Sequence, residues 1–206
     1  MHMHDIAVAS GYLGAALGVA MVVPQILRTV RERGVPGVSA LSWALTAVSC
    51  TAWLLYGVRT GEMPQIPGNV LLVSGAVAVV LLVPSAVGVR TRGFRLAGAG
   101  LVIAMLAAVA PAAGLGAVAI AIGLVSGLPQ TAASLRGRRS GGGSAVSLLT
   151  WSIRVACQAS WLFYAVMVHD LTVTVSAIVL LSNAVAIVLL ESTRRPVPVT
   201  PVPATI

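Results

Sequence analysis

Apolar residues occur along the chain in seven long runs that are separated by short polar connections. The runs cover roughly residues 6–27, 38–58, 66–87, 94–112, 115–135, 145–167 and 171–190. Each run, wound into an α-helix, is long enough to cross a hydrocarbon layer of roughly 30 Å. The pattern therefore predicts an all-α integral membrane protein with seven transmembrane helices.

The composition indicates the same class of protein. Of the 206 residues, 58% are hydrophobic and only 9% are charged, and the mean hydropathy is +0.98. A soluble domain of this length needs more polar surface. The net charge is +8, and all 13 basic residues are arginine. Because the arginines lie in short clusters between the apolar runs, we expect no nucleic-acid partner.

The arginine clusters predict the orientation in the lipid bilayer. Eleven arginines follow odd-numbered runs, one (Arg59) follows an even-numbered run, and Arg154 lies inside the sixth. By the positive-inside rule the arginine-rich connections are cytoplasmic. We therefore expect an external N-terminus and a cytoplasmic C-terminus. The lack of lysine is typical of a GC-rich bacterial genome, which would place this multi-pass protein in the plasma membrane. The eleven are Arg28, Arg31, Arg33, Arg90, Arg92, Arg95, Arg136, Arg138, Arg139, Arg194 and Arg195.

The sequence contains an internal repeat. Residues 38–43, 53–56 and 74–82 align with residues 146–151, 161–164 and 182–190 at a single offset of 108. A Pro-Gln pair recurs at an offset of 105, as Pro24-Gln25 and Pro129-Gln130, so the second copy has three extra residues, which we place within 140–144. Self-similarity of this kind indicates two copies of one structural unit.

The repeat predicts the organisation of the chain. We expect a first three-helix repeat at 1–90, a linker transmembrane helix at 91–113, a second three-helix repeat at 114–191 and a disordered, proline-rich cytoplasmic tail at 192–206. The linker helix crosses the membrane once more, so the two repeats have parallel orientations. Parallel repeats are related by an axis along the membrane normal, and a pathway between them follows that axis.

Each Pro-Gln pair lies inside a predicted helix, where proline removes a backbone hydrogen bond and loosens the helix. One interpretation is a static kink. Because the pair occurs at matching places in both repeats, a hinge formed by Pro24, Gln25, Pro129 and Gln130 is the competing interpretation.

Several motifs together resemble the PQ-loop superfamily. These are Pro24-Gln25 near the end of the first helix, Trp-x-x-Tyr-Gly at 53–57 and Asn69 thirteen residues after the tyrosine. The layout of three, one and three helices over residues 6–190 is similar to that of the SWEET sugar transporters, and the spacing resembles that of their half-size bacterial relatives, the SemiSWEETs.

The resemblance implies facilitated diffusion of a mono- or disaccharide by alternating access, without ATP or an ion gradient. It also implies a sugar site built from a Trp on the second helix and an Asn on the third helix of each repeat. In this chain these residues are Trp53, Asn69 and Trp161. The second repeat departs from the pattern, because Ala177 stands where the Asn is expected. Asn183, six residues further on, would replace it only if its helix were shifted.

An aromatic face and an amide suit the C–H face and the hydroxyl groups of a sugar. The alternative for Trp53 and Trp161 is anchoring at the membrane interface, where tryptophan is common. The alternative for Asn69 is a hydrogen bond between helices. We also expect Glu62 and Asp170, at matching places before the third helix of each repeat, to cap those helices.

Arg154 is unusual because it lies inside an apolar run. Arg154, Gln158 and Trp161 are spaced i, i+4 and i+7, so they share one helix face and are predicted to face the pathway together. A cation there would hold an anionic or polyhydroxylated substrate. The alternative is an arginine that snorkels to the cytoplasmic interface.

No catalytic residue set, metal site or cofactor motif occurs in the sequence, so we expect no enzyme. The absence of lysine excludes a retinal Schiff base. The remaining alternatives to a sugar transporter are a PQ-loop transporter of an amino acid or another small, possibly anionic metabolite, and a non-transporting PQ-loop receptor. The expected partners are the lipid bilayer and a small-molecule substrate. The protein would be a monomer or a homo-oligomer.

Overall fold

The computed structural model describes residues 3–32, 40–82, 88–139 and 147–193. Within these ranges the chain forms only helices, as predicted. The extra residues expected at 140–144 and the tail beyond Thr193 lie outside the described part. The helices are α1 (Met3–Glu32), α2 (Ala40–Thr60), α3 (Gln65–Leu82), α4 (Val89–Val109), α5 (Ala112–Arg139), α6 (Leu148–Met167) and α7 (Leu171–Glu191).

Length and composition agree with a membrane environment. In the described residues, α1, α3, α5 and α7 each contain a stretch long and apolar enough to cross a bilayer. The helices α2, α4 and α6 have 21, 21 and 20 residues, which is also enough to span the hydrocarbon core. Inside a bilayer a helix satisfies its own backbone hydrogen bonds, which explains why described residues in every apolar run adopt this form.

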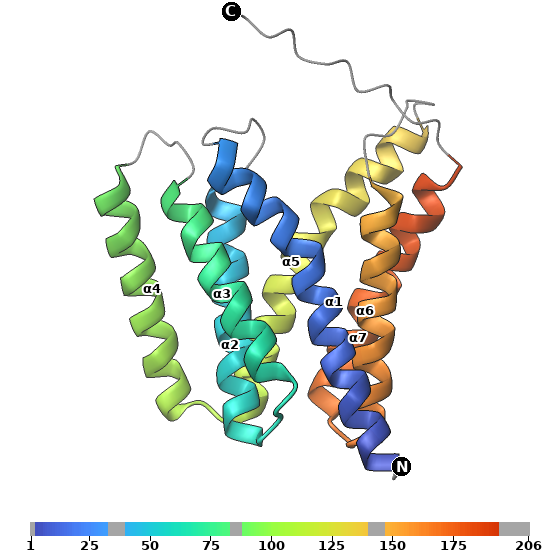
Figure 1. Ribbon diagram of the computed structural model, residues 1–206, viewed down its shortest axis with the longest axis horizontal. Coiled ribbons are helices and arrows are strands. Elements are labelled where there is room, and N and C mark those ends of the chain that lie inside the picture. Colours follow the sequence, from blue (N-terminus) through green and yellow to red (C-terminus); the bar gives the residue numbers. More distant parts are fainter. Residues whose placement is uncertain (1–2, 33–39, 83–87, 140–146, 194–206) are drawn as a thin grey trace, which may run out of the picture.

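The packing of the helices has an approximate two-fold symmetry (Figure 1). Helix α1 packs on α3 and α6, and the corresponding helix α5 packs on α7 and α2. Within each half, α2 packs on α3, and α6 packs on α7. Helix α4 lies outside this six-helix arrangement, against α2 and α3. This is the arrangement that two parallel three-helix repeats and a linker require. The residue boundaries of those units stay predictions.

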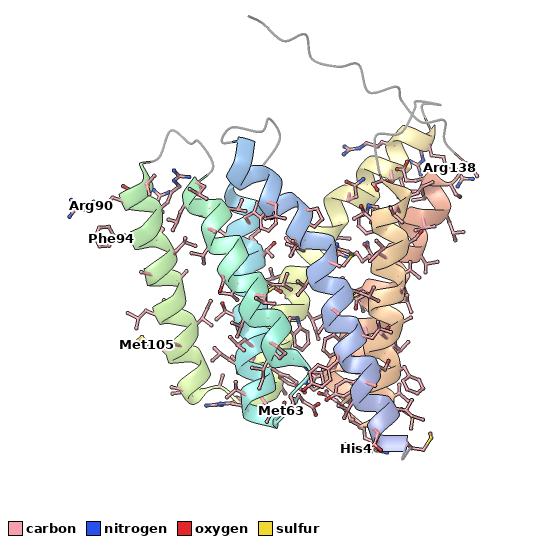
Figure 2. The ribbon with its side chains drawn as sticks, in the orientation of Figure 1. His4, Met63, Arg90, Phe94, Met105 and Arg138 are labelled. Carbon is pink, nitrogen blue, oxygen red and sulfur yellow. The ribbon has the colours of Figure 1, made fainter. Side chains whose placement is uncertain are left out.

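Two ends of the bundle can be distinguished in Figure 2. Arg90 and Arg138 lie at one end, which we call the arginine end, and His4 and Met63 lie at the other, which we call the N-terminal end. The predicted run at 94–112 begins too late, because α4 starts at Val89. Several clustered arginines are therefore helical rather than in connections, since arginine is a good helix former whose long side chain reaches out of the hydrocarbon region.

Two glycines allow the halves to approach closely. A Cβ at Gly11 of α1 would lie 2.9 Å from Cβ of Pro64 and 3.0 Å from Cδ2 of Tyr164, which belongs to the other half. The matching Gly116 of α5 meets Thr172 and Tyr56 in the same way. These neighbours are themselves related by the offset of 108. Small residues at such crossings are typical of helix association in membranes, where van der Waals packing replaces the hydrophobic effect.

We predict that Gly11→Ala destabilises the fold by about 1–3 kcal/mol, because the added methyl group must displace a proline ring and a buried tyrosine. Thermal unfolding in detergent would measure the effect. Gly98→Ala on α4 is the control, since nothing lies within 4 Å of its Cβ position, and alanine there should be neutral or stabilising. Equal melting temperatures for the two variants would contradict a close crossing at Gly11.

Candidate functional site

A cavity of about 310 Å³ lies between the two halves of the bundle. Its described walls come from α1, α2 and α3 of one half and from α5, α6 and α7 of the other, and no described residue of α4 lines it. The volume is at the lower end of the range found for small-molecule sites. The cavity therefore occupies the position where parallel repeats place a pathway.

The lining of the cavity repeats the symmetry of the sequence. Every lining residue of α2 and α3 has a counterpart 108 residues later on α6 or α7 that also lines the cavity, and Gly14 and Gly18 of α1 have Ala119 and Gly123 of α5 at the offset of 105. The matched positions are Thr46 and Arg154, Ser49 and Cys157, Cys50 and Gln158, Trp53 and Trp161, Gln65 and Val173, Gly68 and Ser176, Asn69 and Ala177, and Leu72 and Leu180.

Five of the six predicted substrate-binding residues line this cavity: Trp53, Asn69, Arg154, Gln158 and Trp161. They come from three helices, α2, α3 and α6, which the fold brings together around one cavity. The three residues of α6 share one face of that helix, as predicted.

Asn183 is the exception, since it does not line the cavity. Its Nδ2 donates a hydrogen bond of 2.7 Å to Oγ1 of Thr131, which links α7 to α5. Ala177, at the position matching Asn69, lines the cavity and is 1% exposed. Helix α7 is therefore not shifted to bring Asn183 into the site.

Each tryptophan is positioned by a tyrosine of its own helix. The rings of Trp53 and Tyr56 pack edge to face with centroids 5.5 Å apart, and those of Trp161 and Tyr164 do the same at 5.7 Å. Gly14 makes room for the Trp161 indole, because a Cβ there would lie 2.9 Å from the indole Nε1. Both indoles are half-buried on the cavity wall.

The sequence reasoning missed Gln65. This residue is 3% exposed, lines the cavity, and its Nε2 has no hydrogen-bond partner among the described residues. Asn69 lies one turn further along α3, and its Nδ2 donates to the Gln65 carbonyl oxygen at 2.7 Å. The i, i+4 spacing places both on one helix face and is the signal that could have identified Gln65. Together they offer an unused amide donor and the Asn69 carbonyl oxygen.

A hydrogen bond joins the two halves at the N-terminal end of the bundle. The Tyr56 hydroxyl lies 2.8 Å from both carboxylate oxygens of Asp170. Asp170 also caps α7 by accepting a hydrogen bond from the Val173 backbone N–H at 2.9 Å, as predicted. Glu62 lies in the matching turn of the first half. Its partial burial, and then the charge of Asp170, raise its pKa above the usual value.

Arg154 lines the cavity without a salt-bridge partner. Its guanidinium lies over the Trp151 ring, 5.2 Å from the centroid, and in the described part of the chain it makes no ion pair or hydrogen bond. Cys157, one turn further on, donates from Sγ to the Gly14 carbonyl oxygen at 3.2 Å and so joins α6 to α1.

Both prolines of the Pro-Gln pairs lie within continuous helices. Helix α1 continues beyond Pro24 to Glu32, and α5 continues beyond Pro129 to Arg139, so both pairs lie further from the helix ends than predicted. Gln130 Nε2 lies 3.3 Å from Ser134 Oγ on the next turn. The side chain of Gln25 lies outside what the structure describes. In the described residues, no cluster of three His, Cys, Asp or Glu could hold a metal ion.

Comparisons with known proteins agree with this geometry. The family model described as "PQ loop repeat" matches residues 6–66, which cover α1, α2 and the start of α3. The fold is similar to that of a eukaryotic SWEET transporter solved at 3.7 Å, with a TM-score of 0.73 and 17% sequence identity over 93% of this chain and 98% of that one. No curated protein matches the sequence. The chain therefore matches a PQ loop repeat over residues 6–66 and has the seven-helix membrane fold of a SWEET transporter.

Proposed function

We propose that this protein is a transporter that moves a small sugar across the plasma membrane by facilitated diffusion. The observation that carries the proposal is the cavity between the two repeats, which is lined at matched positions by Trp53 and Trp161. A non-transporting receptor has no need for a site that both halves of a repeated fold share. The proposed function is not enzymatic.

The chemistry of the lining suits a polyhydroxylated solute. An indole face packs against the weakly apolar C–H surface of a sugar ring, while amides bind hydroxyl groups as donors and acceptors. Gln65 offers a donor, Asn69 offers an acceptor, and Gln158 adds a second amide from the other half. An unpaired buried amide is costly, so a hydroxyl group that pairs with Gln65 Nε2 would bind favourably.

Alternating access needs a contact that closes one side of the cavity and can break. With the N-terminal end on the outside, the bond between Tyr56 and Asp170 holds the two halves together on that side of the cavity. Opening to the outside requires this bond to break, and the loosened helices around Pro24 and Pro129 provide the places where α1 and α5 bend. Arg154 favours a second candidate substrate class, a small anionic metabolite, because it places an unpaired cation in the same cavity.

The first test is uptake of labelled glucose and sucrose into proteoliposomes that contain the purified protein. We expect saturable uptake without an ion gradient. Trp161→Ala and Asn69→Ala should each reduce it by about ten-fold or more, since each removes a direct contact with the sugar. Asn183→Ala is the matched control for the amide, because Asn183 lies outside the cavity, and its half-saturation concentration should stay near that of the wild type. Uptake no greater than in empty liposomes would refute transport of these sugars.

The second test concerns closure. Tyr56→Phe removes the hydroxyl that bonds to Asp170, so the cavity should open more often to the outside. We expect a several-fold faster reaction of Cys50, which lines the cavity, with an external, membrane-impermeant maleimide in a Cys157→Ala background. Tyr12→Phe, an exposed tyrosine on α1, is the matched control. An unchanged labelling rate in Tyr56→Phe would show that this bond is not the closure.

The third test concerns the hinges. Replacing Pro24 and Pro129 together by alanine restores two backbone N–H donors and stiffens both helices. If these positions bend during transport, the maximal rate falls several-fold while the half-saturation concentration changes little, because neither proline belongs to the predicted substrate-binding set. Full transport rates in the double variant would instead identify the prolines as static kinks.

A further inference from the structure

The cavity has a symmetric framework but an asymmetric chemistry. At four matched positions, only one repeat carries an amide or a guanidinium group. Gln65 and Asn69 of α3 correspond to Val173 and Ala177 of α7 in the other repeat. Arg154 and Gln158 of α6 correspond to Thr46 and Cys50 of α2. The symmetry of the fold therefore does not require any of these four polar groups.

The polar groups all lie on one side of the cavity. Helices α3 and α6 belong to different repeats, but both pack on α1, whereas α2 and α7 both pack on α5. We call the residues Gln65, Asn69, Arg154 and Gln158 the polar wall. The described lining of the opposite wall has the Trp53 indole with hydroxyl and thiol groups but no amide or charged side chain, and the Ser49 hydroxyl donates to the Ala119 carbonyl oxygen at 3.4 Å. A ligand that fits this cavity is consequently polar on one side.

Arg154 gives the polar wall a net positive charge. It is the one charged side chain of the described lining, and no carboxylate pairs with it in the described residues. A cation inside a membrane domain is costly unless an anion or water compensates it. Stacking on Trp151 orients the guanidinium but leaves its charge uncompensated.

The spacing along α6 fixes the distance between the Arg154 charge and the Trp161 indole, the proposed surface for a sugar ring. Arg154 and Trp161 are seven residues apart on one face, which is about 10 Å along the helix axis, with Gln158 between them. A ring or hydroxylated chain beside Trp161 and Gln158 can therefore extend one acidic end to Arg154. An amino acid fits less well, because its ammonium group would enter a wall whose only charge is positive.

From these observations we propose that the substrate of this cavity is a hydroxylated carboxylic acid, a sugar acid, whose carboxylate pairs with Arg154 while its hydroxyl groups bind the amides of the polar wall. This inference rests on the proposed transport function and narrows its substrate class. A planar guanidinium binds a carboxylate through two parallel hydrogen bonds, which makes Arg154 well suited to the role.

The test compares labelled gluconate with labelled glucose in proteoliposomes that contain the full-length protein. We expect gluconate to be taken up with a half-saturation concentration at least about ten-fold below that of glucose, which is the usual gain from a hydrogen-bonded charge. Because the cargo is an anion, an inside-positive membrane potential should accelerate gluconate uptake and leave glucose uptake unaffected.

Variants of Arg154 separate a carboxylate contact from a structural role. Arg154→Gln should lower the ratio of gluconate to glucose uptake by about ten-fold or more, and Arg154→Lys should restore part of it because the charge is kept. Arg90→Gln removes one positive charge from the exposed surface of α4, away from the cavity, and should leave the ratio unchanged. The elution profile of each variant in size-exclusion chromatography checks that it is folded.

The outcomes distinguish this inference from the proposed function. If glucose is transported while gluconate is neither transported nor competes, the acidic substrate is refuted and the sugar transporter stands. If gluconate is transported but Arg154→Gln leaves the ratio unchanged, Arg154 is an arginine that snorkels to the interface and the inference fails. If neither gluconate nor glucose is transported, the proposed function fails together with the inference.

Discussion

The close contact between the two halves is the constraint on which the structure depends. In lipid, apolar side chains gain little by leaving one apolar surrounding for another, so helices associate only where their backbones approach closely and pack well. Gly11 and Gly116 provide that approach at the two crossings related by symmetry, α1 with α6 and α5 with α2. The same crossings position Tyr164 and Tyr56, which in turn hold the two tryptophans on the cavity wall.

Much of this fold could be predicted from the sequence, because the relevant signals are local. Hydrophobic length gave the seven helices, and the two offsets gave the repeat whose matched positions now line one cavity. Shared helix faces also brought Arg154, Gln158 and Trp161 to that cavity. The start of α4 was predicted too late. A helix can continue beyond the hydrocarbon core through arginines, and a pattern of apolar residues does not show this extension.

The parts that could not be predicted depend on how one helix is rotated against its neighbours. The sequence left open whether Asn183 replaces the missing asparagine, and only the packing of α7 on α5 directs its amide to Thr131. Gln65 was not predicted to be a site residue, because a glutamine at a predicted helix start is ordinary. Gln65 becomes a candidate site residue only because the fold buries it at the cavity and leaves its Nε2 without a hydrogen-bond partner among the described residues. Polar contacts of this kind are properties of the assembled bundle.

The asymmetry of the cavity also gives a physical reason for joining two repeats in one chain. A dimer of identical three-helix units would place every lining residue in the cavity twice, so an arginine at this position of α6 would face a second arginine at the position of Thr46. Two guanidinium groups in one small cavity of low dielectric constant would repel each other strongly. A fused chain can place a single cation on one wall and keep the opposite wall uncharged. The linker α4, none of whose described residues line the cavity, thereby makes a directional site possible.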